Sequence, residues 1–527
     1  MNSLIIAILG ILFFWWAYRF YARSLESLWG IDPKKSTPAY SKYDSVDYIP
    51  AKNQLVLFGH HFASIAGAGP IIGPVIAVTL WGWLPALIWV ILGTIFIGGV
   101  HDFGSLAISV KEGGSSTADI AGHVISKRAK LLFSLFAWLA LILIIAVFAY
   151  FCADTFVKEP KIVLPSLGLI PVAMLVGYLL YHRKANTVLA TILGLLALTG
   201  LIFLGHALPI NGNLVFWVII LLAYCYLASI LPVNILLQPR DYLSSYLLFF
   251  GVGAGYIGLG LAHPVITAPY YHRAATQGDS LWPVLFITIA CGAVSGFHTL
   301  VASGTSSKQI ANERHIKIIG YGAMITEGLV AILAIIACAI LFNPGGLTTS
   351  LENTSPIEIF GRGYGIITRS LFGQYGNFIA IAILNAFILT TLDTATRISR
   401  YLTQELFGIK NRYFSTGIAI VLSAALAFSG QGQKIWLAFG AANQLMAALA
   451  LFVLTCWLLA KKKNPHFTLW PAVFMLFTTV AALVLQAIKY FANKEIVLLA
   501  VVILLLLLTA FMVMEVAPLI FKRRKHG

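Results

Sequence analysis

The sequence consists of apolar runs of 20 or more residues that recur almost from one end to the other. At 1.5 Å per residue, a helix of that length crosses the roughly 30 Å hydrocarbon layer of a bilayer. Only 10% of the 527 residues are charged, against about 25% in soluble domains. We therefore predict an all-α, polytopic membrane protein with about fifteen transmembrane helices.

The predicted spans define three regions of the chain. They are 3–22, 55–80, 84–110, 131–157, 162–182, 187–206, 213–237, 243–263, 281–303, 316–342, 376–400, 413–429, 434–459, 467–491 and 495–520. We expect an N-terminal helix and cytoplasmic loop over 1–54, a transport core over 55–410, and additional C-terminal helices with a basic tail over 411–527.

The net charge of +16 follows from this topology. When successive loops alternate sides, most Lys and Arg residues fall on one side, including Lys34, the run 461–463 and the tail 522–525. The positive-inside rule makes that side cytoplasmic, which places the N-terminus outside and the C-terminus inside. We therefore expect the protein in a cell membrane, surrounded by the lipid bilayer, with no nucleic-acid partner.

Two predicted spans contain residues that break helices. Span 55–80 contains Gly67-Ala68-Gly69-Pro70, and the oppositely oriented span 213–237 contains Leu231-Pro232-Val233-Asn234. In a helix interior, Gly costs about 1 kcal/mol and Pro about 3 kcal/mol. Interrupted helices in two inverted halves are typical of transporters that bind substrate at the breaks, although single kinks are common in membrane helices. The predicted substrate-binding residues are Ser64, Gly67, Gly69, Pro70, Pro232 and Asn234.

Ionisable side chains inside spans are costly and indicate function. A buried, hydrogen-bonded imidazole is the alternative for each histidine. Asp393 and Arg397 share a helix face, which favours a structural ion pair, and Arg240-Asp241 is expected to anchor the cytoplasmic end of span 213–237. The set within or near spans comprises His60, His61, His101, Asp102, His298, Glu327, Asp393 and Arg397.

Sequence motifs give little support to other chemistry. The chain has no phosphate-binding loop and no HExxH motif, so we expect no cofactor. His60, His61 and Asp102 are dispersed, which makes them a weak metal signal, and we predict no metal site. Asn443 and Gln444 have no assigned role.

Several stretches of the chain resemble the carbon starvation protein A family. They cover most of residues 40–450 and include FGHHFASIAGAGPIIGPVIA, VHDF, LPVNILLQPRDYLSSY, LFITIACGAVSGFHTL, IGYG, LTTLDTATR and IWLAFGAANQ. The family includes proton-coupled pyruvate transporters and proteins implicated in peptide uptake. The resemblance implies the fold of the amino acid–polyamine–organocation superfamily, with five-plus-five inverted repeats. The repeats would be spans two to six and seven to eleven.

The resemblance also implies where a coupling ion binds. In that superfamily, the helices matching 55–80 and 281–303 meet where sodium-coupled members hold their ion. We expect His61, Ser64 and His298 to cluster there, with His60 facing elsewhere. Histidine titrates near pH 6.5, which favours protons, whereas hydroxyl groups keep sodium as the alternative. The predicted ion-coupling residues are His61, His298, Ser303, Thr305 and Asp102.

Together these features predict a secondary active transporter rather than an enzyme. Its expected substrate is a small carboxylate, pyruvate in preference, or a short peptide, imported by alternating access and coupled to protons. The alternative is a membrane-embedded metal-dependent enzyme or a nutrient sensor. A transporter predicts saturable uptake into proteoliposomes that responds to an ion gradient. An enzyme predicts tight metal binding and turnover without a gradient.

Overall fold

The computed structural model describes residues 2–44, 47–51, 53–181, 183, 186–231, 236–272, 280–342, 354–429 and 432–524. Within these residues the regular secondary structure is helical, apart from one isolated bridge between Asn2 and Val265. The predicted all-α class is confirmed.

The first part of the chain forms the helices α1 to α9, two pairs of which are joined by π-helical turns. Its helices are α1 (Ser3–Trp16), α2 (Ala22–Trp29), α3 (Pro38–Ser41), α4 (Gln54–Ile65), α5 (Gly69–Trp81), α6 (Trp83–Gly93), α7 (Gly99–Lys111), α8 (Thr117–Val124) and α9 (Lys127–Lys158). Wider π-helical turns join α1 to α2 at Ala17–Tyr21 and α6 to α7 at Thr94–Gly98.

The remaining helices follow in two groups. The middle of the chain forms α10 (Val163–Tyr181), α11 (Thr187–Ala207), α12 (Leu214–Ile230), α13 (Leu237–Ala262), α14 (Leu281–Thr288), α15 (Phe297–Gly304) and α16 (Ala323–Ala339), which a π-helical turn at Lys317–Gly322 precedes. The last part forms α18 (Pro356–Ile367), α19 (Arg369–Phe372), α20 (Gly376–Phe407), α21 (Arg412–Ala427), α22 (Gly432–Ala460), α23 (His466–Ala492) and α24 (Ile496–Arg524).

The helices are long and apolar enough to make a multi-pass membrane protein. In the described residues, eleven helices qualify by length and composition, or twelve if α4 and α5 form one bent span. The helices α12 and α21 are apolar but have only 17 and 16 residues. Length and composition therefore do not confirm the predicted count of fifteen.

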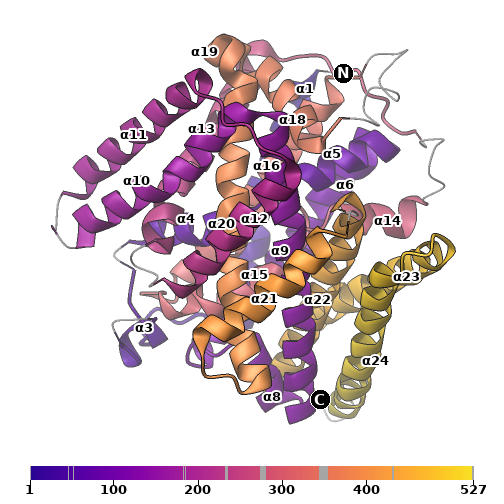
Figure 1. Ribbon diagram of the computed structural model, residues 1–527. Helices are drawn as coiled ribbons and strands as arrows, with labels where there is room; N and C mark the ends of the chain where they lie inside the picture. The colour runs from indigo at the N-terminus through magenta and orange to yellow at the C-terminus, as the bar shows by residue number, and fades with distance from the viewer. Residues whose placement is uncertain are drawn as a thin grey trace.

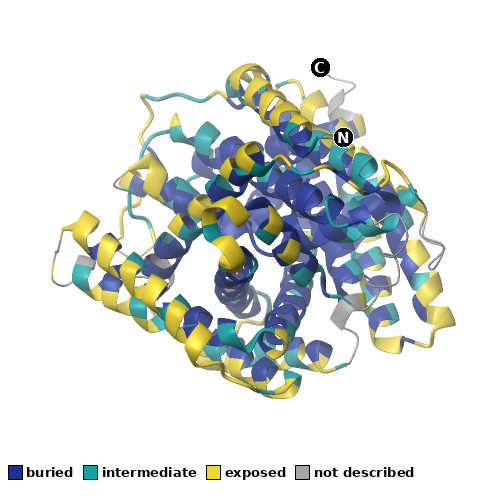
Figure 2. Ribbon diagram, turned by 90° about the horizontal axis from the view of Figure 1, so that it is seen from above, coloured by how far each residue is buried: buried dark blue, intermediate teal, exposed yellow. Residues whose placement is uncertain are grey.

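The molecule buries its middle and exposes apolar side chains on its outer helices. Seen from above, buried residues fill the centre and exposed residues form the rim (Figure 2). On α11, for example, Val188, Leu196 and Phe203 are each more than 60% exposed. Such continuous apolar exposure would be unusual on a soluble protein but suits contact with lipid.

The two ends of the chain lie at opposite ends of the bundle. Figure 1 shows α3, α8 and the C-terminal end at the bottom, and α19 and the N-terminal end at the top. The segments around α3 and α8 belong to the loops that the charge pattern assigns to the cytoplasm. The arrangement is compatible with an odd number of membrane crossings.

We predict that a reporter fused after His526 is cytoplasmic and one fused before Met1 is external. The physical reason is the concentration of Lys and Arg in the loops that share an end with the C-terminus. Paired reporters, one active only inside and one only outside the cell, measure this orientation. An external reading at the C-terminus would overturn the topology.

Candidate functional site

The first predicted helix break is present between α4 and α5. The helix α4 ends at Ile65 and α5 begins at Gly69, with their axes bent by 46°. The amides of Ala66 and Gly67 donate to the carbonyls of Phe62 and Ile65, which closes the end of α4. Pro70 lies in the first turn of α5, where a missing N–H costs no helical hydrogen bond.

A second interruption lies where the sequence predicted a continuous helix over 281–303. The helix α14 ends at Thr288 and α15 begins at Phe297, so that residues 289–296 lie outside regular helix. The prediction of one continuous span is therefore wrong. The predicted second break at Leu231-Pro232-Val233-Asn234 is not tested, because residues 232–235, with Pro232 and Asn234, lie outside the described residues.

The two interrupted segments cross with their halves antiparallel. The helix α4 packs against α15, and α5 packs against α14. A Cβ atom on Gly69 would lie 2.3 Å from the Cβ atom of Cys291, and one on Gly73 would lie 2.4 Å from the carbonyl oxygen of Thr288. Only glycine fits these two positions in this arrangement, because real Cβ contacts do not come below 3.0 Å.

Asn443 of α22 stabilises the second interruption. Its Oδ1 accepts a hydrogen bond from the amide of Phe297 at 2.9 Å, and its Nδ2 donates to Ser295 Oγ at 3.0 Å. Its own carbonyl accepts from the amide of Gly296 at 3.0 Å. The side chain and backbone of one residue thus satisfy groups that no helix satisfies, as membrane depth requires. No role was assigned to Asn443 from the sequence.

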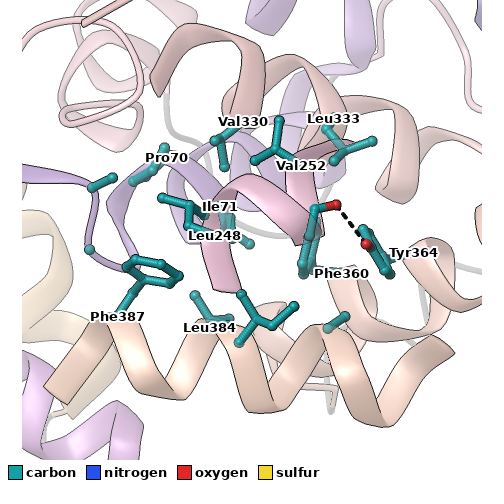
Figure 3. Close-up of a pocket in the computed structure, with 15 residues that line it drawn as sticks. Pro70, Ile71, Leu248, Val252, Val330, Leu333, Phe360, Tyr364, Leu384 and Phe387 are labelled. Carbon is teal, nitrogen blue, oxygen red and sulfur yellow. Dashed lines mark hydrogen bonds between the residues drawn. The ribbon is translucent and has the colours of Figure 1, made fainter. Parts of the chain in front are cut away.

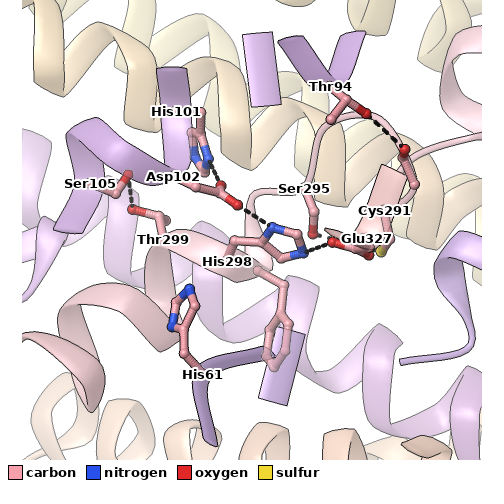
Figure 4. Close-up of polar contacts among 12 residues, drawn as sticks. His61, Thr94, His101, Asp102, Ser105, Cys291, Ser295, His298, Thr299 and Glu327 are labelled. Atoms are coloured by element: carbon pink, nitrogen blue, oxygen red, sulfur yellow. Dashed lines mark hydrogen bonds and ion pairs between the residues drawn. The ribbon is translucent and has the colours of Figure 1, made fainter. Parts of the chain in front are cut away.

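Four ionisable side chains meet beside the crossing. His298 Nδ1 lies 2.7 Å from Asp102 Oδ2, and His298 Nε2 lies 3.2 Å from Glu327 Oε2 (Figure 4). The second Asp102 oxygen lies 2.7 Å from His101 Nδ1. All four side chains are fully buried. We call them the charge cluster; it joins α7, α15 and α16.

The charge cluster can hold a proton and release it. A protonated imidazole donates from both ring nitrogens, so a charged His298 can donate to Asp102 and Glu327 together. A neutral His298 has one N–H and leaves one carboxylate without that donor. An unpaired buried charge is costly. The state with a charged His298 and the state with a neutral His298 therefore favour different arrangements of the carboxylates around the ring. The sequence predicted His298 and Asp102 as ion-coupling residues. It indicated Glu327 only as a further candidate to carry the proton if His61 does not.

The adjacent histidines of α4 face different neighbours, as predicted. His61 is fully buried, its Nδ1 lies 2.7 Å from Ser306 Oγ, and its ring lies near His298 (Figure 4). His60 Nδ1 instead lies 3.2 Å from Asp241 Oδ2 of α13. Ser64 is one turn beyond His60, and its hydroxyl donates to the His60 carbonyl at 2.9 Å.

The two hydroxyls predicted on span 281–303 lie away from the crossing. Ser303 Oγ donates to the carbonyl of Thr299 at 2.7 Å, and Thr305 Oγ1 donates to the carbonyl of Val301 at 2.9 Å. Both lie at the far end of α15 from the interruption. Whether these hydroxyls or the other predicted residues bind an ion or substrate stays a prediction.

A second buried ion pair corrects one sequence interpretation. Arg240 lies in the first turn of α13 and is fully buried. Its Nη1 pairs with Asp393 of α20 and with the hydroxyl of Tyr224. Arg397, the expected partner of Asp393, donates instead to the carbonyls of Ala228 and Leu231 at the end of α12. Whether Arg240-Asp241 anchors a cytoplasmic helix end stays a prediction.

An apolar cavity adjoins the first interruption. Its volume is about 30 Å³, and its lining includes Gly67, Pro70 and Phe387 (Figure 3). Tyr364 lies at its edge and donates a hydrogen bond to the Gly251 carbonyl at 2.7 Å. Among the described residues, no group of three or more His, Cys, Asp or Glu side chains could hold a metal ion.

The sequence matches the family described as carbon starvation protein CstA over residues 2–347 and 342–482. The chain belongs to this family. It is 30% identical to the peptide transporter CstA of Campylobacter jejuni, over 94% of this chain and 82% of that protein. It is 31% identical to the Bacillus subtilis peptide transporter CstA, over 86% of this chain and 85% of the relative. The carbon starvation family resemblance is thereby confirmed.

A third relative is named for a different substrate. The chain is 29% identical to the pyruvate/proton symporter BtsT of Escherichia coli, over 89% of this chain and 80% of that protein. All three relatives are named as transporters. Two of them are named for peptides and one for pyruvate.

We predict that Arg240→Leu destabilises the protein by about 3–5 kcal/mol, because it leaves the Asp393 carboxylate buried without its partner. The double variant Arg240→Leu/Asp393→Leu should recover most of that loss. Arg362→Gln, which removes the exposed Arg362–Glu358 pair, should cost under about 1 kcal/mol. Thermal unfolding of the detergent-solubilised protein measures all three. Equal effects of Arg240→Leu and Arg362→Gln would contradict the prediction.

Proposed function

We propose that this chain is a secondary transporter that imports a small carboxylate, pyruvate in preference, together with protons. The observation that carries the proposal is His298, which bridges the buried carboxylates of Asp102 and Glu327 beside two crossing interrupted helices. Buried ionisable groups in membrane helices mark ion pathways and proton relays. The names of the relatives support transport, and one of them names pyruvate and protons.

Alternating access is supported by a correspondence between two sets of helices. Each interrupted segment precedes a π-helical turn, at Thr94–Gly98 or Lys317–Gly322, and then a helix of 32 residues, α9 or α20. Each set continues with a short apolar helix, α12 or α21, and a long one, α13 or α22. We pair these two sets as the inverted repeats, in place of spans two to six and seven to eleven. The hairpin α10–α11 and the helices α18 and α19 would then be insertions.

The substrate is proposed to bind at the first interruption. At the N-terminus of α5 the amides of Ile71 and Ile72 donate to the Ala68 carbonyl and Pro70 has no N–H, so the amides of Ala68 and Gly69 are the ones that could bind an anion such as a carboxylate. The adjoining cavity is lined by Pro70, Ile71 and Phe387, which suits the apolar part of a small substrate. Short peptides are the second candidate, because the relatives in Campylobacter jejuni and Bacillus subtilis are named peptide transporters.

Protons are favoured over sodium by the chemistry around the crossing. The hydroxyls of Ser64 and Thr305 donate to carbonyls of their own helices, which is how Ser and Thr commonly bond in apolar surroundings. His298 instead offers two ring nitrogens, each facing a buried carboxylate, and an imidazole placed in this way can carry a proton.

We predict that Gly69→Val abolishes uptake while the protein still inserts and folds. The added side chain meets Cys291, which a Cβ atom alone already approaches to 2.3 Å. Gly260→Val is the matched control, because a Cβ at Gly260 of α13 meets nothing within 4 Å. The pair Gly69→Ala/Cys291→Gly should transport better than Gly69→Ala alone. Uptake of radiolabelled pyruvate and dialanine into proteoliposomes is the measurement, and normal uptake by Gly69→Val would refute the site.

We predict that uptake rises as external pH falls and that His298→Gln loses this response. Glutamine keeps a polar side chain but cannot carry the proton shared by Asp102 and Glu327. His61→Gln should weaken the pH response more than it weakens substrate binding. His466→Gln, at an exposed position, is the control. The initial uptake rate and the accumulation ratio are measured between pH 5.5 and 8, roughly the range in which histidine titrates.

Two results would contradict the proposed proton coupling through His298 and His61. Full gradient-driven accumulation by both His298→Gln and His61→Gln would show that the proton is carried elsewhere. Uptake driven by a sodium gradient at constant pH would replace the proton with sodium.

A further inference from the structure

Hydroxyl groups from three helices form a continuous hydrogen-bonded chain next to the charge cluster. Thr299 Oγ1 of α15 donates to Ser105 Oγ of α7 at 2.9 Å. Thr117 Oγ1 of α8 lies 3.0 Å from Thr299 Oγ1 and 3.2 Å from Ser303 Oγ, and its single O–H can donate to one of these oxygens at a time. Because Thr299 donates to Ser105, the chain is continuous when Thr117 donates to Thr299. All four side chains are at most 2% exposed. We call Ser105, Thr299 and Thr117 the hydroxyl chain.

The inner end of the hydroxyl chain lies within one helical turn of the charge cluster. Ser105 follows Asp102 by three residues on α7, a spacing that places two side chains on one helix face. Thr299 directly follows His298. Figure 4 shows the Ser105–Thr299 hydrogen bond beside the Asp102–His298 pair. Among the described residues, Ser105 has no direct hydrogen bond to the charge cluster, so the proposed relay needs a water molecule between them.

The outer end of the hydroxyl chain lies one residue from a partly exposed position at the start of α8. Thr117 is the first residue of α8, and the partly exposed Ser116 before it donates from Oγ to Asp119 Oδ2 at 2.7 Å. Burial acts to raise the pKa of Asp119, but hydrogen bonds from Lys130 and Ser116 outweigh it and lower that pKa. Asp119 is therefore ionised at neutral pH. The helix α8 lies at the same end as the chain's C-terminus (Figure 1).

Hydroxyl groups in such a chain can pass a proton along by exchanging O–H bonds, so that no ion has to travel through the protein. Each hydroxyl has lone pairs that accept a proton and an O–H that can pass a different proton onward. Carboxylates or imidazoles in the same place would hold the proton and add charge to a buried position. The purely structural alternative is that the hydroxyls only hold α8 against α15.

We infer that Ser105, Thr299 and Thr117 relay the coupling proton between the charge cluster and the end of the molecule that carries α8. This inference rests on the proposed proton-coupled transport. One proton passes from the cluster to Ser105, a second from Ser105 to Thr299, a third from Thr299 to Thr117, and a fourth from Thr117 to water beside Asp119. Each oxygen gains one O–H bond and loses one, so no charge stays on the chain.

The structure holds the hydroxyl chain in the direction that carries protons toward the cluster, because Thr299 donates to Ser105. Rotation of the three C–O bonds reverses every donor and acceptor. The hydroxyl chain can therefore release a proton toward α8 only after the three C–O bonds have rotated. The same bonds rotate back to restore the starting arrangement.

The test separates net uptake from exchange in proteoliposomes that contain the full chain. Net uptake of radiolabelled pyruvate or dialanine under a proton gradient requires proton release in every cycle. Exchange of labelled for unlabelled substrate at equal pH does not, because the transporter returns still protonated. Thr299→Val and Thr117→Val keep the side-chain shape but remove the hydroxyl. Each should lower the net uptake rate about tenfold or more and leave exchange unchanged.

Two further variants distinguish a relay from a structural contact. Thr299→Ser restores a hydroxyl and should restore net uptake. Thr326→Val removes a hydroxyl next to Glu327 that donates to the carbonyl of Gly322 on its own helix, and it should change neither rate. Unchanged net uptake in Thr299→Val, or equal losses of net uptake and exchange, would overturn the relay. Absence of exchange in the unmodified protein would instead reject the proposed transport function itself.

Discussion

The architecture depends on satisfying backbone groups where two helices are interrupted at membrane depth. Hydrocarbon offers no hydrogen bonds, so every amide and carbonyl freed by an interruption must find a partner in the protein. The first interruption closes mostly on itself, through the amides of Ala66 and Gly67. The second relies on Asn443, which bonds residues 295–297 from α22. Hydrogen bonds as well as apolar packing therefore fix the position of α22 next to the crossing.

Charge inside the bundle is held in two separate groups with different partners. The charge cluster joins α7, α15 and α16 through His298. The pair of Arg240 and Asp393 joins α13 to α20, with Tyr224 of α12 as a third member. An ion pair between arginine and aspartate keeps its charges and can act as a structural link. A histidine between two carboxylates can instead carry one ring proton or two, which is the property that the proposed proton coupling requires.

The sequence predicted features that depend on neighbouring residues in the chain. It did not predict features that depend on contacts between residues far apart in the chain. The first interruption was predicted because Gly67, Gly69 and Pro70 lie in one short run. The second was missed because residues 289–296 contain no proline, and their irregular backbone is stabilised by Asn443, about 150 positions away in the chain. The pairing of Asp393 with Arg240 was missed for the same reason. Helix spacing correctly separated His60 from His61, but it could not show that Glu327 faces His298.

The glycines at the crossing also determine how the two interrupted segments can move. At Gly73 the backbone of α5 lies against the Thr288 carbonyl, and at Gly69 it lies against the side chain of Cys291. A contact that close leaves little room for the segments to slide past each other. In the proposed transport cycle the crossing would therefore act as a pivot. Opening α4 from α15 on one side of the pivot would press α5 against α14 on the other, so that the two sides would not open together.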